Sequence, residues 1–406
     1  MHPNEEADIV CVSVMDWEHP FQSSRHHLMR QLAQRHRVLF VDNQLNPLTA
    51  LKGFREPAMR RKLATWSHLT PNPRQIDSRL WVYNPPPVMP MGKLTDRRLF
   101  EAAYAVNQRR LRDGVRAACK ALGFSRPLLW ISFNVLSSES LIGSLNERMV
   151  IYHCTDEITA MANTSPFAGE IERRLLGRSD LVFTSSRQLL ADKSPFNANS
   201  HFVPNGADTE LFERALEPEL PVHAAIADLP HPLIGFAGHL EERLDFGLLA
   251  SLARLRPDWH FAFAGPVSPS RRQAASELAQ LPNVHMLGLL PREELPALLK
   301  GLDVALIPFA RTPQTRAIYP LKLNEYLAAG KPVVLTPFAD LREFTGLVAI
   351  AEGAEAFAAA IADELAHDSI ERRWSRVRLA RTNTWAARAA QMTYLINQTL
   401  SNRQSA

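Results

Sequence analysis

The sequence has few cysteines and no long apolar run. Its three cysteines, Cys11, Cys119 and Cys154, are too few for a disulfide framework or a four-cysteine zinc site, and they predict a reducing compartment. No apolar stretch approaches the roughly 18 residues that cross a bilayer, and the opening letters MHPNEEADIVCV match neither a secretory signal nor a transit peptide. HExxH and Cys/His zinc spacings are also missing. We therefore expect a cytoplasmic protein without a sequence-encoded metal site.

The composition is that of a globular protein, but its charge is uneven. Apolar residues make up 46% and charged residues 22% of 406 residues, which excludes disorder, collagen and coiled coil and favours two or three domains. Residues 50–120 contain 15 Lys and Arg but only 5 Asp and Glu. This excess predicts either an anionic partner, such as a membrane surface, or a merely solvated basic face. No nucleic-acid motif is present, so we expect no nucleic-acid partner.

Two consecutive series of strands and helices are predicted, and strand–helix–strand units of this kind form parallel sheets. In the first series, strands are expected at 8–17, 37–43, 79–87, 127–133, 148–156, 179–186 and 200–208, with helices at 23–35 and 94–122. In the second, strands are expected at 232–240, 259–266, 283–290, 303–310, 332–336 and 347–352, with helices at 245–255, 270–280, 292–300 and 321–330.

We therefore predict two doubly wound α/β domains. They comprise residues 1–212 and 232–380, and the proline-containing segment 213–231 is the predicted linker between them. Ligands of open parallel sheets bind at the carboxyl ends of the strands, so the polar residues that follow each strand are the first candidates for a site.

The stretch YPLKLNEYLAAGKPVVLT, residues 319–336, is the most informative motif. If a helix begins near Leu321, Lys322 and Glu325 lie on one face of its first turns, where the helix dipole favours a phosphate. Lys322 is then placed to meet a diphosphate and Glu325 to accept hydrogen bonds from ribose hydroxyls. Gly330 ends the helix. The alternative is an ordinary surface Lys–Glu pair with a glycine cap.

This stretch resembles the signature of the "glycosyl transferases group 1" family, whose members have the GT-B fold. The matching residues are Glu325, Ala328, Ala329, Gly330, Pro332, Val333 and Val334. The resemblance implies two Rossmann-like domains facing a cleft, with a C-terminal helix, here 381–406, crossing back to the first domain. It departs at Ala317, where the family carries an acidic residue that approaches the transferred sugar.

Further segments resemble the same family. VPNGADTELF (203–212) matches at Asn205, Gly206, Asp208 and Phe212, and residues 235–266 and 284–309 are similar to two more units of the nucleotide-binding domain. Where the family has an arginine and then a lysine for the donor diphosphate, this chain has His239 and Arg243. The expected nucleotide-sugar site comprises Asn205, Gly238, Arg243, Gly265, Tyr319, Pro320, Leu321, Lys322 and Glu325. For Arg243 the alternative is a surface arginine at a helix start.

The amino-terminal half matches the family more loosely, since its first loop has no glycine. Ser24, Arg25, His26 and His27 open the first predicted helix and are candidates for binding acceptor hydroxyls or a phosphate, the alternative being helix capping and a polar surface. His153 and Asp156 follow a predicted strand, where the family often presents a histidine or aspartate to the reacting sugar. The alternative is a turn whose aspartate caps the next helix.

The resemblance implies a glycosyltransferase that moves a sugar from a nucleoside-diphosphate sugar to a hydroxyl acceptor in polysaccharide or glycoconjugate biosynthesis. It further implies retention of anomeric configuration and no metal or other cofactor. The basic region 50–120 predicts a lipid-linked or glycan acceptor at the inner face of the cell membrane. Two other functions remain open: a sugar-nucleotide epimerase of the same fold, and a catalytically silent sugar-nucleotide or carbohydrate-binding subunit, because Ala317 replaces the expected acid.

Overall fold

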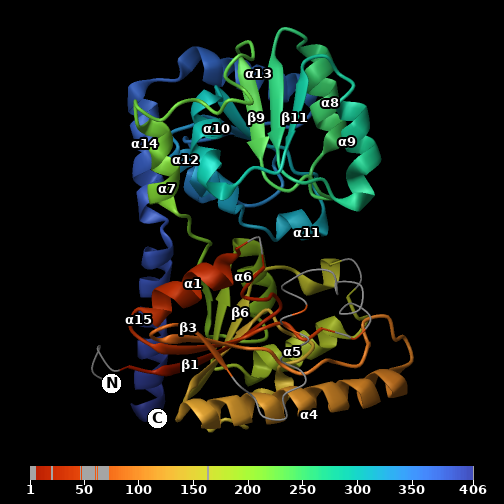
Figure 1. The fold of residues 1–406 in the computed structure, drawn as a ribbon, viewed down its shortest axis with the longest axis vertical. Helices are drawn as coiled ribbons and strands as arrows, with labels where there is room; N and C mark the ends of the chain where they lie inside the picture. Colours follow the sequence, from red (N-terminus) through yellow and green to blue (C-terminus); the bar gives the residue numbers. More distant parts are fainter. Residues whose placement is uncertain are drawn as a thin grey trace. The chain divides into compact units, whose positions relative to one another are not determined.

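The computed structural model describes residues 6–19, 22–45, 47, 60, 62, 73–161 and 164–405. The chain divides into two compact units (Figure 1). Unit 1 consists of Met1–Pro204 together with Arg388–Ala406, and unit 2 consists of Asn205–Ala387.

Unit 1 is built on an eight-stranded sheet with the strand order β3-β4-β2-β1-β5-β6-β7-β8. All neighbouring strands pair in parallel except β3, which is antiparallel to β4 at one edge. The strands are β1 (Asp8–Ser13), β2 (Arg37–Val41), β3 (Arg74–Asp77), β4 (Leu80–Tyr83), β5 (Leu128–Ser132), β6 (Met149–Cys154), β7 (Leu181–Thr184) and β8 (Ser200–Phe202). Every residue of β1, β5 and β6 is buried, as expected for central parallel strands covered on both faces.

The helices of the described part of unit 1 all lie between its strands in the chain, except the last. They are α1 (Ser24–Ala33), α4 (Arg97–Leu122), α5 (Ala168–Arg178), α6 (Arg187–Lys193) and the greater part of α15 (Trp385–Ser405). The long helix α4 begins where the Asp96 side chain accepts a hydrogen bond from the Leu99 amide, and it ends at Gly123 in the left-handed conformation. Helix α15 packs beside β8, because Asn199 donates to the Thr399 hydroxyl at 3.2 Å.

Unit 2 is built on a six-stranded sheet in which all neighbouring strands are parallel, in the order β11-β10-β9-β12-β13-β14. Its strands are β9 (Leu233–Ala237), β10 (His260–Ala264), β11 (Val284–Gly288), β12 (Val304–Ile307), β13 (Val333–Leu335) and β14 (Ala349–Ile350). Its helices are α7 (Thr209–Glu213), α8 (Phe246–Leu255), α9 (Arg272–Leu278), α10 (Leu295–Gly301), α11 (Pro313–Arg316), α12 (Leu321–Ala328), α13 (Ala354–His367) and α14 (Ile370–Thr382).

The boundaries of these units differ from the predicted ones. The predicted strand 200–208 ends at Phe202, and unit 2 begins at Asn205 rather than after residue 212. The segment 213–231, expected to be a linker, belongs to unit 2, where it forms a turn of 3-10 helix and buries Ile226. Across the described ranges, no helix combines the length and the apolar composition that a membrane crossing requires.

Candidate functional site

In unit 2, two glycines line the carboxyl ends of adjacent strands. Gly238 follows β9 and Gly265 follows β10, and these two strands pair in parallel. A Cβ atom on Gly238 would lie 1.8 Å from Cε of Lys322, and one on Gly265 would lie 1.9 Å from the carbonyl oxygen of Gly238. Their φ angles, +153° and +144°, are also unfavourable for any other residue. The two positions therefore require glycine, and no side chain covers the backbone at these two strand ends.

Lys322 projects from the first turn of α12 toward this bare backbone. Its ammonium nitrogen lies 5.4 Å from the ring centroid of Phe236, and no carboxylate among the described residues forms an ion pair with it. Burial lowers the pKa of Lys322 to about 8, since the raising effect of Glu325 is smaller than the cost of desolvating the ammonium group. An anion bound beside Lys322 would stabilise the charged form of its ammonium group.

Glu325, one turn further along α12, is near Arg292. The nearest oxygen and nitrogen of the two side chains are 4.0 Å apart, and Arg292 also lies 3.7 Å from Asp208. Burial raises the pKa of Glu325, an effect that Arg292 and Lys322 oppose. Arg292 was not among the predicted site residues, because nothing in the sequence pattern of residues 284–309 indicates that the Arg292 side chain faces α12.

Arg243, the predicted diphosphate ligand, is paired within its own loop. Its guanidinium contacts the carboxylate of Glu241, which also lies 3.7 Å from a ring nitrogen of His239. Arg243 therefore lies near Gly238, Gly265 and Lys322, and its positive charge contributes to the lowered pKa of Lys322. Its carboxylate partner, Glu241, was not among the predicted site residues.

The remaining predicted residues of unit 2 shape the start of α12. The amide of Asn205 donates to the carbonyl of Tyr319 at 3.0 Å, and Pro320 is the residue that precedes the first helical position, Leu321. Asn205 in turn accepts, through its carbonyl, a hydrogen bond from Asn324 at 3.3 Å. These contacts fix the entry of α12 and hence the direction in which Lys322 points.

Ala317 occupies the position of the family's first acidic residue. It is 1% exposed and forms the C-cap of the short helix α11, with its amide bonded to carbonyls of that helix. A carboxylate at this buried position would need a new partner. The structure therefore accommodates the apolar residue, and the acidic function of the family is missing at this position.

In unit 1, Arg25 and its neighbours lie at the start of α1. Ser24, Arg25 and His26 are buried, whereas His27 is half-buried. The Nδ1 atom of His26 accepts from the Ser23 amide at 3.1 Å, so its other ring nitrogen donates to the Asp16 carbonyl at 3.0 Å. Burial lowers the pKa of His26 to about 4, which keeps this tautomer neutral. In the structure, His26 takes part in the capping of α1, which was the alternative to a contact with the acceptor.

His153 and Asp156 end up in different surroundings. His153, on β6, is 1% exposed and packs edge-on against Trp130 with ring centroids 5.8 Å apart. Burial lowers its pKa to about 3, and its Nδ1 atom has no hydrogen-bond partner among the described residues. Asp156 lies just beyond the strand, half-buried, and accepts from the Thr155 hydroxyl at 3.1 Å. The two side chains share a strand end but do not bond to each other.

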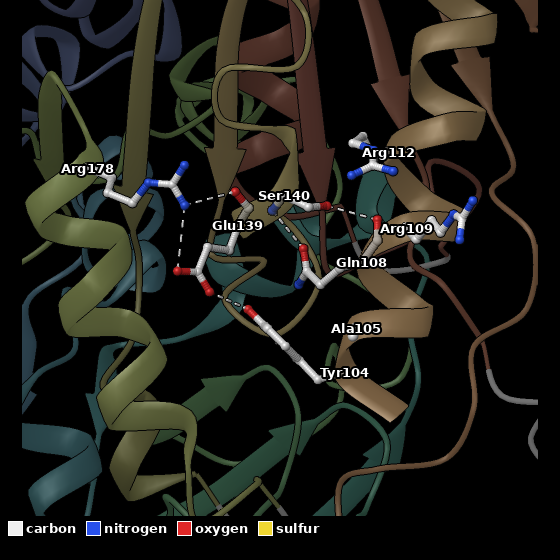
Figure 2. Close-up of a pocket in the computed structure, with 8 residues that line it drawn as sticks. All are labelled: Tyr104, Ala105, Gln108, Arg109, Arg112, Glu139, Ser140 and Arg178. Atoms are coloured by element: carbon white, nitrogen blue, oxygen red, sulfur yellow. Dashed lines mark hydrogen bonds and ion pairs between the residues drawn. The ribbon is translucent and has the colours of Figure 1, made fainter. Parts of the chain in front are cut away.

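Unit 1 also has a cavity of about 540 Å³ between α4 and α5, which contains none of the predicted residues (Figure 2). Figure 2 shows that hydrogen bonds close its floor: the Tyr104 hydroxyl donates to Glu139 at 2.8 Å, and Ser140 bonds to Gln108 at 2.8 Å. Arg178 approaches the same carboxylate. The carboxylate of Glu139 is thus held by hydrogen bonds and ion pairs with its neighbours.

Metal ligands are not gathered anywhere in the described ranges, where no three His, Cys, Asp or Glu side chains form a group suited to an ion. The predicted nucleotide-sugar residues meet in unit 2, at the carboxyl edge of its sheet. The predicted acceptor and catalytic residues lie in unit 1, at the carboxyl edge of the other sheet.

Solved structures share this architecture over nearly the whole chain. A sucrose-phosphate synthase from Thermosynechococcus elongatus superimposes with a TM-score of 0.70 at 18% identity, covering 98% of this chain and 100% of that one. An E. coli structure described as trehalose-6-phosphate bound with UDP-2-fluoro glucose superimposes with a TM-score of 0.69 at 14% identity, covering 97% and 99%. At these identities the likeness establishes the fold, which is GT-B. The predicted fold is confirmed.

The sequence comparisons are more specific. Residues 231–367 match the family model described as "Glycosyl transferases group 1". A putative teichuronic acid biosynthesis glycosyltransferase of Bacillus subtilis is 32% identical over 224 residues, covering 52% of this chain and 55% of the relative. A D-inositol 3-phosphate glycosyltransferase of Corynebacterium glutamicum is 26% identical over 263 residues, covering 57% and 60%.

The chain thus has the GT-B fold, and its residues 231–367 match the model of the group 1 glycosyltransferase family. This confirms the resemblance that the motif at 319–336 indicated. The matched region spans somewhat more than half the length of each of these two relatives.

Proposed function

We propose that this protein is a glycosyltransferase that takes a sugar from a nucleoside-diphosphate sugar and transfers it to a hydroxyl acceptor. Unit 2 binds the donor and unit 1 binds the acceptor. The observation that carries the proposal is the cluster of Gly238, Gly265 and Lys322, in which glycine is required at two strand ends and the half-buried side chain of Lys322 lies against the backbone of Gly238. Sites of this form, at a helix start beside bare backbone, bind phosphate groups.

The chemistry of this cluster fits the leaving group of such a transfer. When the bond between the sugar and the diphosphate breaks, negative charge grows on the diphosphate. The ammonium group of Lys322 and the N-terminus of α12 are placed to stabilise that charge. Arg243 adds a second cation once it exchanges Glu241 for the diphosphate. With these cations in place, the departing diphosphate needs no resident metal ion.

Glu325 is assigned to the ribose of the donor. Its carboxylate lies one helical turn beyond Lys322 on the same face of α12, so a ligand whose diphosphate meets Lys322 can present its ribose to Glu325. The charge of Arg292, 4.0 Å away, favours the ionised form, which is the form that accepts two hydroxyl hydrogen bonds. His153 and Asp156 are assigned to the reacting sugar and the acceptor, and the transfer proceeds with retention of configuration, as the family resemblance implies.

The printed names of the relatives and neighbours support a role in glycan synthesis. The Bacillus subtilis relative is named for teichuronic acid biosynthesis, and the E. coli structure is described with a bound UDP sugar. We therefore assign the chain to polysaccharide or glycoconjugate biosynthesis with a glycan or lipid-linked acceptor.

The proposal is tested first by donor binding. Nucleoside diphosphates are titrated calorimetrically against the wild-type chain, Glu325→Gln, and the control Glu355→Gln, whose side chain is exposed on α13. Losing the charge-assisted hydrogen bonds of Glu325 should weaken binding about 10- to 100-fold, the equivalent of about 1.5–3 kcal/mol. Glu355→Gln should bind like the wild type. Equal affinity in all three proteins would remove Glu325 from the donor site.

Turnover is tested separately, with a panel of nucleotide sugars and glycan acceptors. Release of nucleoside diphosphate together with a new glycoside is the expected result. Conversion of the sugar nucleotide without a glycoside would identify an epimerase instead. Because Ala317 is apolar and buried, a silent binding subunit is the second candidate function, and tight donor binding without any turnover or hydrolysis would establish it.

Helix α4 supports peripheral attachment to an anionic membrane. The segment 50–72 of the predicted basic region lies almost wholly outside the described residues, but α4 exposes a row of basic side chains: Arg97, Arg98, Arg109, Arg110, Arg116 and Lys120. Leu99 on the same helix is 61% exposed. Charge reversal of Arg98, Arg109 and Arg116 to Glu should abolish flotation with vesicles containing anionic lipid. Equal flotation of both proteins would refute the attachment.

A further inference from the structure

Arg25 is a buried cation without a carboxylate partner in the described part of unit 1. Its side chain is 5% exposed. Its Nε atom donates to the hydroxyl of Ser132 at 3.2 Å, and its two terminal nitrogens lie 3.4 Å from the hydroxyls of Ser23 and Thr155. All three partners are neutral. Burial lowers the pKa of Arg25, and the charge of Asp156 opposes this from a distance at which no ion pair forms.

A buried guanidinium in this state is costly to the fold. Hydrogen bonds to hydroxyl oxygens replace only part of the solvation free energy that the buried charge loses. Buried charges in proteins are ordinarily paired with an opposite charge. The other buried arginine of the described residues shows the usual solution: Arg376, 1% exposed, bonds to the carboxylate of Asp368 at 2.6 Å. Arg25 lacks such a partner within the described residues, so its charge leaves room for an anion beside it.

Two unsatisfied polar atoms lie on the same face of the sheet. Ser132 of β5 and His153 of β6 are register partners, and partners in a parallel sheet point to the same face. Because Ser132 bonds to Arg25, His153 and Trp130, two residues before Ser132, lie on the face of the sheet that Arg25 covers. The Nδ1 atom of His153 and the Nε1 atom of Trp130 are both buried without a hydrogen-bond partner among the described residues. Such atoms are rare in native structures.

The terminal nitrogens of Arg25 are the atoms of this side chain that a ligand would reach first. The hydroxyls that they contact belong to Ser23 and Thr155, which are only half-buried, whereas the Nε partner Ser132 is fully buried. The two contacts are long, and the guanidinium fork matches the paired oxygens of a phosphate or carboxylate. The N-terminus of the ten-residue helix α1 adds positive potential at the same place.

We propose that Arg25 is the centre of an anion-binding site in unit 1 that takes a phosphate or carboxylate group carried by the acceptor. That the ligand is an acceptor rests on the proposed glycosyl transfer, whereas the anion site itself does not. The acceptor is therefore an anionic sugar or an anionic glycan, rather than a neutral one. Asp156 sets the strength of the site, because its carboxylate repels the incoming anion.

The first experiment measures thermal unfolding of the full chain in sodium phosphate and in sodium chloride of equal ionic strength. Phosphate should raise the melting temperature of the wild type more than that of Arg25→Met, which compares the specific site with the general effect of phosphate on proteins. Without phosphate, Arg25→Met should be at least as stable as the wild type, because it removes an unpaired buried charge. A less stable variant with an unchanged response to phosphate would show that Arg25 is purely structural.

The second experiment separates the two sources of the anion. Glucose 1-phosphate, glucuronate and glucose are titrated calorimetrically against the wild type, Arg25→Lys and Asp156→Asn. At least one of the two anionic sugars should bind to the wild type. Its affinity should be tenfold or more weaker in Arg25→Lys and several-fold tighter in Asp156→Asn. If glucose 1-phosphate binds more tightly than glucuronate, the site prefers phosphate, and the opposite order indicates carboxylate. Equal binding of glucose, or no binding of either anion, would overturn the proposal.

The failure of this site and the failure of the proposed function give different results. Nucleoside diphosphate binding in unit 2 should be unchanged in Arg25→Met and about 10- to 100-fold weaker in Glu325→Gln. If the chain proves to transfer no sugar, the phosphate-dependent stabilisation through Arg25 is still expected. If transfer occurs to neutral acceptors with the wild-type rate in Arg25→Met, the anion site is refuted while the glycosyltransferase stands.

Discussion

Lys322 makes nucleoside diphosphate binding depend on pH in a defined direction. Burial lowers the pKa of its ammonium group from 10.5 to about 8. Only the charged form attracts the diphosphate, and the bound diphosphate holds the proton on Lys322 at higher pH. Affinity should therefore be constant below about pH 8 and fall about tenfold for each further pH unit, until the pKa of the complex is reached.

The magnitude follows from the size of the shift. A difference of about 2.5 pKa units corresponds to about 3 kcal/mol, and this is an upper limit because Lys322 is half-buried and keeps some contact with solvent. The unfolded chain holds the proton up to about pH 10.5, so stability should rise between about pH 8 and pH 10.5, where the folded protein releases it first. Lys322→Met should accordingly stabilise unit 2 at pH 7 by up to about 3 kcal/mol while it abolishes diphosphate binding.

The assay is calorimetric titration with a nucleoside diphosphate from pH 7 to pH 9.5. The terminal phosphate of the ligand, with a pKa of about 6, is ionised throughout this range. Lys322→Arg should remove the pH dependence, because a guanidinium stays charged. Lys331→Met is the matched control: burial lowers the pKa of Lys331 to about 8 as well, but its ammonium group bonds to the carbonyls of Lys300 and Leu302 instead. Wild-type affinities that agree at pH 7.5 and pH 9.5 would refute the reasoning.

Three further substitutions test the packing. Gly265→Ala places a Cβ atom 1.9 Å from the Gly238 carbonyl oxygen, and denaturant unfolding should show a loss of about 3 kcal/mol; a loss below 0.5 kcal/mol would contradict the required bare backbone. Gly177→Ala, inside α5 with open space around its Cβ, should instead add about 0.5–1 kcal/mol in the same measurement. Lys193→Met removes the ammonium group that lies 2.8 Å from the buried carboxylate of Glu172, and the unpaired carboxylate should cost about 3–5 kcal/mol of stability at pH 7.

The sequence predicted the sheets well because their central strands carry an unbroken apolar signal. The run 148–156 contains β6 and the run 8–17 contains β1, and every residue of both strands is buried. The edge strand β3 was missed because its letters, RQID, are polar and mostly exposed, which is what an antiparallel edge allows. Periodicity finds strands that are covered on both faces and overlooks those that are not.

The site was predicted in part. The motif at 319–336 locates Lys322 and Glu325 on one helix, since their spacing is local and helix geometry decides it. The partners that set their charge state come from elsewhere in the chain: Arg292 lies beside Glu325, and Glu241 pairs with Arg243. Neither contact can be predicted from the local sequence pattern, because each depends on how loops meet at the ends of the strands. At His26 the residue type left two roles open, and the hydrogen bond from the Ser23 amide gives its ring a part in the helix cap.

The division of the chain has a consequence for its synthesis on the ribosome. Unit 2 is one continuous stretch, Asn205–Ala387, whereas unit 1 needs Arg388–Ala406 to complete it. In that last stretch Met392 is 1% exposed, and Arg403 pairs with Asp180 at 2.7 Å. The first unit to be translated is thus the last to be finished, and its sheet must wait with an uncovered edge while all of unit 2 emerges and folds. An edge left open for that time is where a chaperone would bind the nascent chain.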